Sequence, residues 1–243
     1  MKPFLFLSTR AEHEVADSEA AAFAHYAGLD DAAFRWHRLD QEPLPELVLE
    51  DFSGIILGGS PFNASDDPAL KSATQLRVEA ELAALLDIVV VCDFPFLGAC
   101  YGVGTLGRHQ GGAIDRQYGE PISAVEVTLT ADGVLDPLLR GLPERFEAFV
   151  GHKEACSALP PGAALLASSQ SCPVQMFRLR ENLYATQFHP ELDLAGLLLR
   201  VDTYQHAGYF PAGDVERVRA AAQASHVEAP QGILRNFVNR YAR

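Results

Sequence analysis

Positive charge is scarce in this chain. Lysine and arginine together number 19 against 32 aspartates and glutamates, which gives a formal net charge of −13. An acidic surface repels phosphate groups, so this balance argues against a nucleic-acid partner and against binding to an anionic membrane. The acidic residues are spread along the chain rather than run together, which is typical of an ordinary solvated surface.

Membrane and export signals are also missing from the sequence. No apolar stretch reaches the length needed to span a membrane. The N-terminal MKPFLFLSTR contains a short apolar run, but it lacks the longer apolar region and the small-residue cleavage site of a signal peptide. It predicts a first β-strand instead, and we expect a cytoplasmic protein.

Cysteine is sparse as well, with four residues at positions 92, 100, 156 and 172. Their spacing matches no zinc ligand set, so we predict no metal site. Four cysteines in a chain of this length do not suggest a disulfide framework either. In a reducing compartment, Cys100 would stay free to react.

Apolar patterns of strand and helix alternate in the first hundred residues. Strands are predicted at 4–8, 34–39 and 53–59, and helices at 12–27 and 72–93. This alternation argues for an α/β fold with a parallel sheet covered on both faces. Later strands are predicted at 124–129, 146–151, 163–168, 173–179 and 182–188, and they form an antiparallel or mixed β layer. Helices follow at 193–206, 213–225 and 231–241.

No repeat, low-complexity tract or linker divides the chain, and 48% of its residues are hydrophobic, enough for a sizeable core. We expect one domain over residues 1–243. Its core would cover about residues 1–195, and a C-terminal helical extension would cover about 196–243.

The segment 72–93 carries two conflicting signals. Its end, IVVVC, is β-branched and favours a strand by propensity. Val78, Leu82, Leu85 and Val89, however, continue one apolar stripe at helical spacing. We predict one long helix, because the strand that leads to Cys100 must begin just after Pro95.

A cysteine lies between glycines in the sequence Gly98-Ala99-Cys100-Tyr101-Gly102. The apolar residues before it and the small residues after it predict a buried strand, a sharp turn and the start of a helix. On its own, Cys100 would fit a small buried hydrophobe, as most free cysteines do. The predicted position at a helix N-terminus instead favours the thiolate and a nucleophile.

The group His189-Pro190-Glu191 lies at the end of another predicted strand. A cysteine nucleophile needs a base, and the base needs a group that orients it. His189 alone would fit a buried structural histidine, and Glu191 alone would fit a helix N-terminal acid. Together, the rigid proline turn and a glutamate two residues after the histidine favour an oriented base.

Four segments together resemble the class I glutamine amidotransferases, in particular stand-alone proteins similar to the amidotransferase half of GMP synthase. They are SGIILGGSP, PFLGACYGVG, PPGAALLASSQSCPVQMF and YATQFHPE, and they occur in the family's order. The resemblance implies a flavodoxin-like, mostly parallel sheet flanked by helices, with additional β-strands. It also implies a catalytic triad of Cys100, His189 and Glu191.

The family stabilises an oxyanion with two backbone N–H groups. The resemblance implies that Tyr101, directly after the nucleophile, supplies one of them. The second would come from Ser60, with Gly59 in the place of the family's first glycine. His152 in GHKEA resembles a histidine found at the same place in the GMP-synthase-like relatives, and it is a secondary candidate.

One position departs from the family pattern. The family commonly has C-x-G-x-Q, in which the glutamine side chain helps to hold the substrate, whereas this chain has Gly104 there. We expect a lost polar contact and opened space at this position. Weaker use of free glutamine, or room for a bulkier γ-glutamyl compound, would follow.

The resemblance implies hydrolysis of the glutamine γ-amide through a γ-glutamyl thioester to glutamate and ammonia, with no cofactor or metal. The partners would be this small-molecule substrate and an ammonia-accepting synthetase. One alternative is a γ-glutamyl peptide hydrolase. A second alternative, of another class, is a catalytically weak binding or regulatory subunit.

Overall fold

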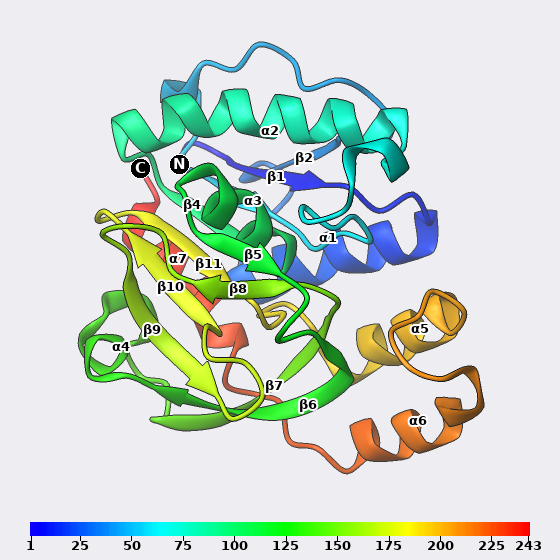
Figure 1. Cartoon of the computed structure of the whole chain (residues 1–243). Helices are drawn as coiled ribbons and strands as arrows, with labels where there is room; N and C mark the ends of the chain where they lie inside the picture. Colours follow the sequence, from blue (N-terminus) through cyan, green and yellow to red (C-terminus); the bar gives the residue numbers. More distant parts are fainter.

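A computed structural model describes residues 1–243, apart from the side chain of residue 212. A nine-stranded sheet runs through the molecule in the order β2-β1-β3-β4-β11-β10-β9-β6-β7 (Figure 1). Its strands are β1 (Phe4–Ser8), β2 (Phe34–Arg38), β3 (Gly54–Leu57), β4 (Phe96–Ala99), β6 (Glu120–Leu129), β7 (Arg145–His152), β9 (Ala164–Ser169), β10 (Met176–Leu179) and β11 (Leu183–Thr186). β5 (Ala113–Asp115) and β8 (Ala155–Ala158) pair with each other in a separate small sheet.

The strands β2, β1, β3, β4 and β11 are parallel to one another, which confirms the predicted α/β fold. The strands β10, β9, β6 and β7 are antiparallel to their neighbours. These antiparallel strands continue the same sheet, because β10 hydrogen-bonds to β11.

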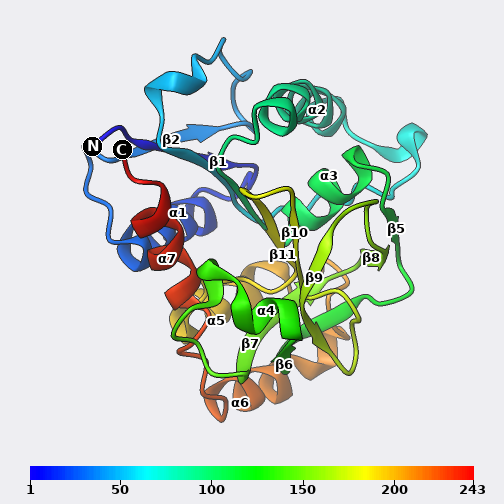
Figure 2. The same cartoon turned by 90° about the vertical axis from the view of Figure 1, so that its left-hand side faces the viewer.

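Helices cover both faces of the parallel part (Figure 2). They are α1 (His13–Ala27), α2 (Ala73–Cys92), α3 (Tyr101–His109), α4 (Ala131–Leu135), α5 (Leu194–Tyr204), α6 (Val215–Gln223) and α7 (Gln231–Tyr241). α1 and α7 pack on one face, and α2 and α3 on the other, each around its own apolar cluster. A third cluster joins α5 and α6 to β6 and β7. Among the described residues, no helix has both the length and the apolar character needed to cross a membrane.

The segment 72–93 forms one helix, α2, as the apolar stripe predicts. Val78, Leu82, Leu85 and Val89 are all buried against the sheet. The hydroxyl of Ser72 caps the first turn by accepting from the Gln75 amide. Burial of the stripe therefore outweighs the strand propensity of the β-branched end.

Candidate active site

Several polar side chains meet where parallel strands end. Cys100 follows β4 directly, and His189 lies three residues after β11. Gly59 and Ser60 follow β3, and Arg10 comes two residues after β1. Ligands of open α/β sheets bind at this carboxyl edge, because the loops there leave the sheet together.

Cys100 occupies a strained turn between β4 and α3. Its backbone has φ 52° and ψ −80°, and its N–H donates to the Thr186 carbonyl at 2.6 Å. Close packing requires glycine at position 98, because a Cβ there would lie 2.6 Å from the Cα of Gly102. The predicted strand, sharp turn and helix are confirmed, and this turn places Cys100 at the carboxyl edge of the sheet.

His189 and Glu191 form an oriented pair. The Nδ1 atom of His189 lies 2.8 Å from Glu191 Oε1, and both side chains are buried. The backbone N–H of His189 donates to the Phe149 carbonyl at 3.0 Å, which ties this turn to β7. In the tautomer with its proton on Nδ1, directed at Glu191, the imidazole keeps a free lone pair on Nε2, and the contact of Arg200 Nη1 with Nδ1 is then not a hydrogen bond.

Three further charged residues surround this pair. Glu19 Oε1 accepts from Arg10 Nε at 2.8 Å and from Arg200 Nη2 at 3.0 Å. Arg200 Nη2 also donates to Glu191 Oε1 at 2.9 Å. Arg10, Glu19 and Arg200 are each at most 5% exposed. Together with the buried Glu191 they form a network of two cations and two anions.

No sequence motif marks these three residues, because they are far apart in the chain. Arg10 lies in the loop after β1, Glu19 lies on α1 and Arg200 lies on α5. The one available signal was Arg10, a cation directly after an apolar strand. The charges could be assigned to the site only once the fold had brought these elements together.

Arg200 also affects the imidazole directly. Its Nη1 atom lies 2.9 Å from His189 Nδ1, on the same side as Glu191. Burial lowers the pKa of His189 first, and the positive charges of Arg200 and Arg10 lower it further, whereas Glu191 acts in the opposite direction. The imidazole is therefore neutral at pH 7, as a general base must be.

The expectation of a thiolate at Cys100 is wrong for this state of the protein. Burial raises the pKa of the Cys100 thiol to about 12, which outweighs the lowering by Arg10 and Arg200. The helix N-terminus does not compensate for the lost hydration of the thiol, because Cys100 is only 9% exposed. Cys100 rests as a thiol and must pass its proton to a base when it attacks.

We predict that Cys92 reacts faster than Cys100 with iodoacetamide at neutral pH. Cys92 is exposed, whereas Cys100, Cys156 and Cys172 are buried. An electrophilic glutamine analogue should reverse the order, because binding places it against Cys100. Peptide mapping after substoichiometric labelling measures both, and preferential labelling of Cys156 or Cys172 by the analogue would contradict the assignment.

Ser60 and Tyr101 both present free amide groups beside Cys100. Within the described residues, neither backbone N–H donates to another group of the protein. Gly59, the residue before Ser60, has no room for a side chain. A Cβ there would lie 2.6 Å from both Arg10 Nη2 and His189 Cε1. Glycine is therefore required at 59 by space, while the side chain at 60 is tolerated and its hydroxyl accepts from the Phe62 amide.

The expected opening at Gly104 does not exist. A Cβ on Gly104 would lie 2.6 Å from Glu154 Oε1 and 3.2 Å from the Ala64 Cβ. The Glu154 carboxylate fills this place and accepts from the amides of Ala64 and Ser65 at 2.8 and 2.7 Å. The expectation that space at position 104 admits bulkier substrates is therefore wrong.

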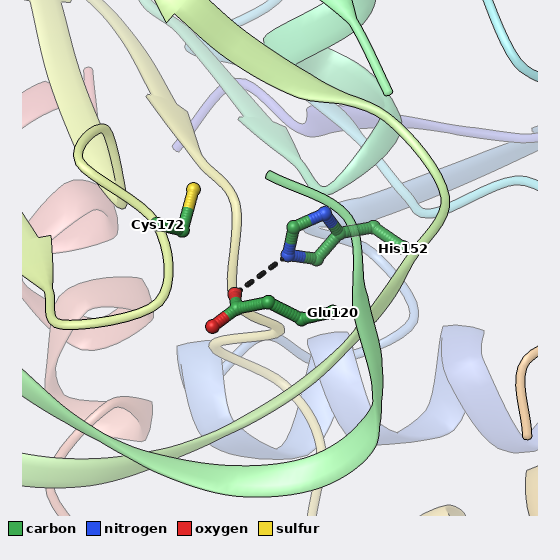
Figure 3. A group of neighbouring side chains, drawn as sticks. All are labelled: Glu120, His152 and Cys172. Carbon is green, nitrogen blue, oxygen red and sulfur yellow. Dashed lines mark hydrogen bonds and ion pairs between the residues drawn. The ribbon is translucent and has the colours of Figure 1, made fainter. Parts of the chain in front are cut away.

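His152 is held in a second buried cluster (Figure 3). Its Nε2 lies 2.7 Å from Glu120 Oε2, and its Nδ1 lies 2.8 Å from the Glu154 carbonyl. Cys172 lies beside this pair, so the three residues offer ligand atoms within 4.8 Å of one another. Both ring nitrogens of His152 are already directed at oxygen acceptors, so this geometry favours a positioning role for His152 over metal binding.

A second group with metal-ligand atoms consists of Glu19, His189 and Glu191. Its two carboxylates are already neutralised by Arg10 and Arg200. A divalent cation would add charge to a balanced network, so these residues fit an ion-paired site better than a metal site.

Two hollows meet at Cys100. The Glu154 hollow is lined by Ser60, Cys100, Gly104, Lys153, Glu154 and Gln187. The Arg200 hollow is lined by Arg10, Cys100, His189, Leu197, Arg200 and Tyr204. Tyr209 lines both of them and lies over Lys153, whose Nζ is 4.7 Å from the ring centroid.

Comparisons with known proteins match the chain to one protein family. The family model for class-I glutamine amidotransferases matches residues 20–196. A glutamine-hydrolyzing GMP synthase subunit of Methanoculleus marisnigri is 33% identical over 155 residues, which cover 63% of this chain and 73% of that protein. The corresponding subunit of Thermococcus kodakarensis is 30% identical over 152 residues, or 62% and 72% of the two chains.

Solved structures show the same fold. A glutamine amidotransferase from Thermotoga maritima superposes with a TM-score of 0.77 at 20% identity, covering 99% of this chain and 98% of its own. A glutamine amidotransferase from Methylobacillus flagellatus gives a TM-score of 0.71 at 21% identity, with 100% and 96% coverage.

Proposed function

Because the chain belongs to the class I glutamine amidotransferase family, we propose that it hydrolyses the γ-amide of glutamine with Cys100 as nucleophile, His189 as base and Glu191 as orienting acid. One observation carries the proposal. A cysteine on a strained turn and a neutral, Glu191-oriented histidine line one hollow at the sheet edge. The products would be glutamate and ammonia.

The first step transfers a proton as the sulfur attacks. The Cys100 thiol gives its proton to His189 Nε2, and the sulfur forms a bond to the γ-carbonyl carbon. The carbonyl oxygen becomes an oxyanion, which the free amides of Ser60 and Tyr101 would stabilise. Because the thiol pKa is about 12, this transfer has to accompany the attack rather than precede it.

The second step breaks the C–N bond. His189 returns the proton to the leaving nitrogen, ammonia departs, and a γ-glutamyl thioester remains on Cys100. Water then attacks the thioester with His189 again accepting a proton, which releases glutamate and restores the thiol. Glu191 holds the imidazolium that forms in each step.

An ammonia-accepting synthetase is the proposed partner. The support is the name of two relatives, each of which is one subunit of a glutamine-hydrolyzing GMP synthase. A protein named as one subunit works beside another, so the ammonia released at Cys100 would be used by a second protein.

The test is ammonia and glutamate release by the purified chain with glutamine as substrate. Release in equal amounts that disappears in Cys100→Ala supports the proposal. A protein that binds glutamine but releases neither product, alone or with a synthetase, would instead support the alternative of a binding or regulatory subunit.

We predict that Glu191→Gln is less damaging than His189→Ala. Glutamine can still accept from Nδ1 but cannot stabilise the imidazolium by charge, whereas alanine removes the proton acceptor itself. The loss for His189→Ala should be about 10³-fold or more in kcat/KM. Steady-state kinetics of both variants, with folding checked by circular dichroism, measure the difference, and equal losses would assign Glu191 a direct part in proton transfer.

A further inference from the structure

The outer side of α2 is apolar although it faces solvent. Nine of the residues described on this helix are exposed, and Asp87 is the one charged residue among them. Leu76, Ile88 and Val91 are 45%, 55% and 75% exposed. The other exposed residues are Ala73, Ala80, Ala83, Ala84 and Cys92. A surface helix normally carries polar and charged residues on its outer side, so α2 has a second apolar stripe that one copy of the chain leaves unburied.

Two hollows flank this stripe, and Figure 2 looks along α2 at the surface of the molecule. One hollow of about 350 Å³ lies on the α3 side and is lined by Ala83 and Tyr101. The other, of about 340 Å³, lies on the side of residues 44–49 and is lined by Leu47 and Ile88. A ridge with a groove on each side is the shape by which helices pack on one another. The outer side of α2 is therefore shaped to receive another helix.

The order of residues along α2 favours a second copy of α2 as that helix. Its large exposed side chains lie towards the two ends, and alanines lie in the middle. In an antiparallel pair centred on the alanines at 83–84, Leu76 of one copy lies opposite Val91 of the other. Asp87 then lies opposite Ala80, so no like charges meet. Small residues at the centre also let the two helices approach closely.

The size of the surface is sufficient for a dimer. A helix of 20 residues is about 30 Å long. A strip roughly 20 Å wide, or two helix diameters, would bury about 600 Å² on each copy. The total of roughly 1,200 Å² lies at the lower end of the range for specific interfaces.

Charge and position also favour a second copy. Each copy carries a net charge of −13, so two copies repel, but the outer side of α2 contributes little of that charge. A synthetase that receives ammonia has to reach Cys100 at the carboxyl edge of the sheet. The stripe on α2 points away from the sheet, because the opposite side of the helix packs on it. Contact with a synthetase at Cys100 would therefore leave this stripe free.

We propose that two copies of this chain associate through the outer sides of their α2 helices, packed antiparallel about a two-fold axis near residues 83 and 84. Each copy uses the same surface, so the contact is closed and gives a dimer rather than a filament. The small area predicts a dissociation constant on the order of 10 µM.

Sedimentation equilibrium of the wild type from about 1 to about 200 µM, a range that brackets this constant, measures the association. Ala84→Glu places a carboxylate at the centre of the contact and should weaken dimerisation by about 100-fold or more. Ala221→Glu makes the same change at an exposed alanine of α6 and is the matched control. It should dimerise like the wild type.

Cysteine cross-linking tests the antiparallel orientation. The background is Cys92→Ala, because the other three cysteines are buried. Under mild oxidation, Ala84→Cys should form a covalent dimer with itself, since its two copies lie beside the axis. Leu76→Cys and Val91→Cys should cross-link when the two variants are mixed and not when either is alone.

Three results would overturn the inference. A wild type that stays monomeric up to about 200 µM would leave the stripe to a different occupant. Ala84→Glu that dimerises like the wild type would place the contact elsewhere on the molecule. Leu76→Cys that cross-links to itself would contradict the antiparallel packing. None of these measurements uses enzyme activity, so the inference is tested independently of the proposed function.

Discussion

Replacing Cys100 by alanine is expected to lower kcat/KM for glutamine by about 10³-fold or more. The substitution removes the sulfur that forms the thioester, and no neighbouring nucleophile shares its turn. The fold should persist, because the alanine Cβ fits where the cysteine Cβ already lies. Ammonia release measured with equal amounts of folded protein gives the ratio.

Cys92→Ala is the matched control for this variant. Cys92 is the exposed cysteine at the end of α2, distant from the sheet edge that carries the site. It should keep wild-type activity. Cys100→Ala that retains more than about a tenth of the wild-type rate would reject the thioester route, because residual catalysis without the nucleophile is far smaller.

Replacing Glu19 by glutamine is expected to destabilise the fold by about 3–5 kcal/mol. Glu19 is the anion between Arg10 and Arg200, and all three side chains are buried. Without it, Arg10 loses the carboxylate that it pairs with among the described residues, and Arg200 keeps Glu191 as its one anionic partner there. Breaking a buried ion pair leaves an uncompensated charge in a medium that solvates it poorly. Urea denaturation at pH 7 measures the change in the free energy of unfolding.

Glu14→Gln on the same helix is the control, because Glu14 is exposed in the first turn of α1. Its effect on the free energy of unfolding should stay within about 0.5 kcal/mol.

The wild type should also lose stability in acid. Burial opposes the ionisation of Glu191, but the charges of His189 and Arg200 outweigh it and lower the Glu191 pKa to about 2 in the fold, against about 4.3 in the unfolded chain. Its stabilisation is therefore complete above the unfolded value and is lost as the pH falls towards about 2.

His189 acts in the same direction. Its pKa is lowered by burial, so the unfolded chain binds a proton more readily than the fold below its ordinary pKa of about 6.5. The urea concentration at the midpoint of unfolding should therefore be lower at pH 3 than at pH 7.

The outcome that would contradict the Glu19 prediction is a Glu19→Gln variant with wild-type stability. It would show that water reaches the network and solvates its charges.

The sequence by itself determined the family, the alternation of strands and helices, and the two motifs around Cys100 and His189. These features are local. Glycines flank a strained turn, a proline fixes another, and an apolar stripe at helical spacing selects a helix for 72–93. Each depends on residues close together in the chain, so pattern and steric rules suffice to predict it.

The tertiary structure decided the electrostatics of the site. The charged neighbours of His189 and Glu191 are remote in sequence: Arg10 lies in the loop after β1, Glu19 on α1 and Arg200 on α5. Only the fold brings their charges to His189 and Glu191. Burial then raises the thiol pKa that a helix N-terminus alone would lower. At Gly104 the sequence indicated an absent side chain, whereas the fold placed Glu154 there. Desolvation and the filling of space depend on every neighbour of a group, and most of those neighbours are remote in sequence.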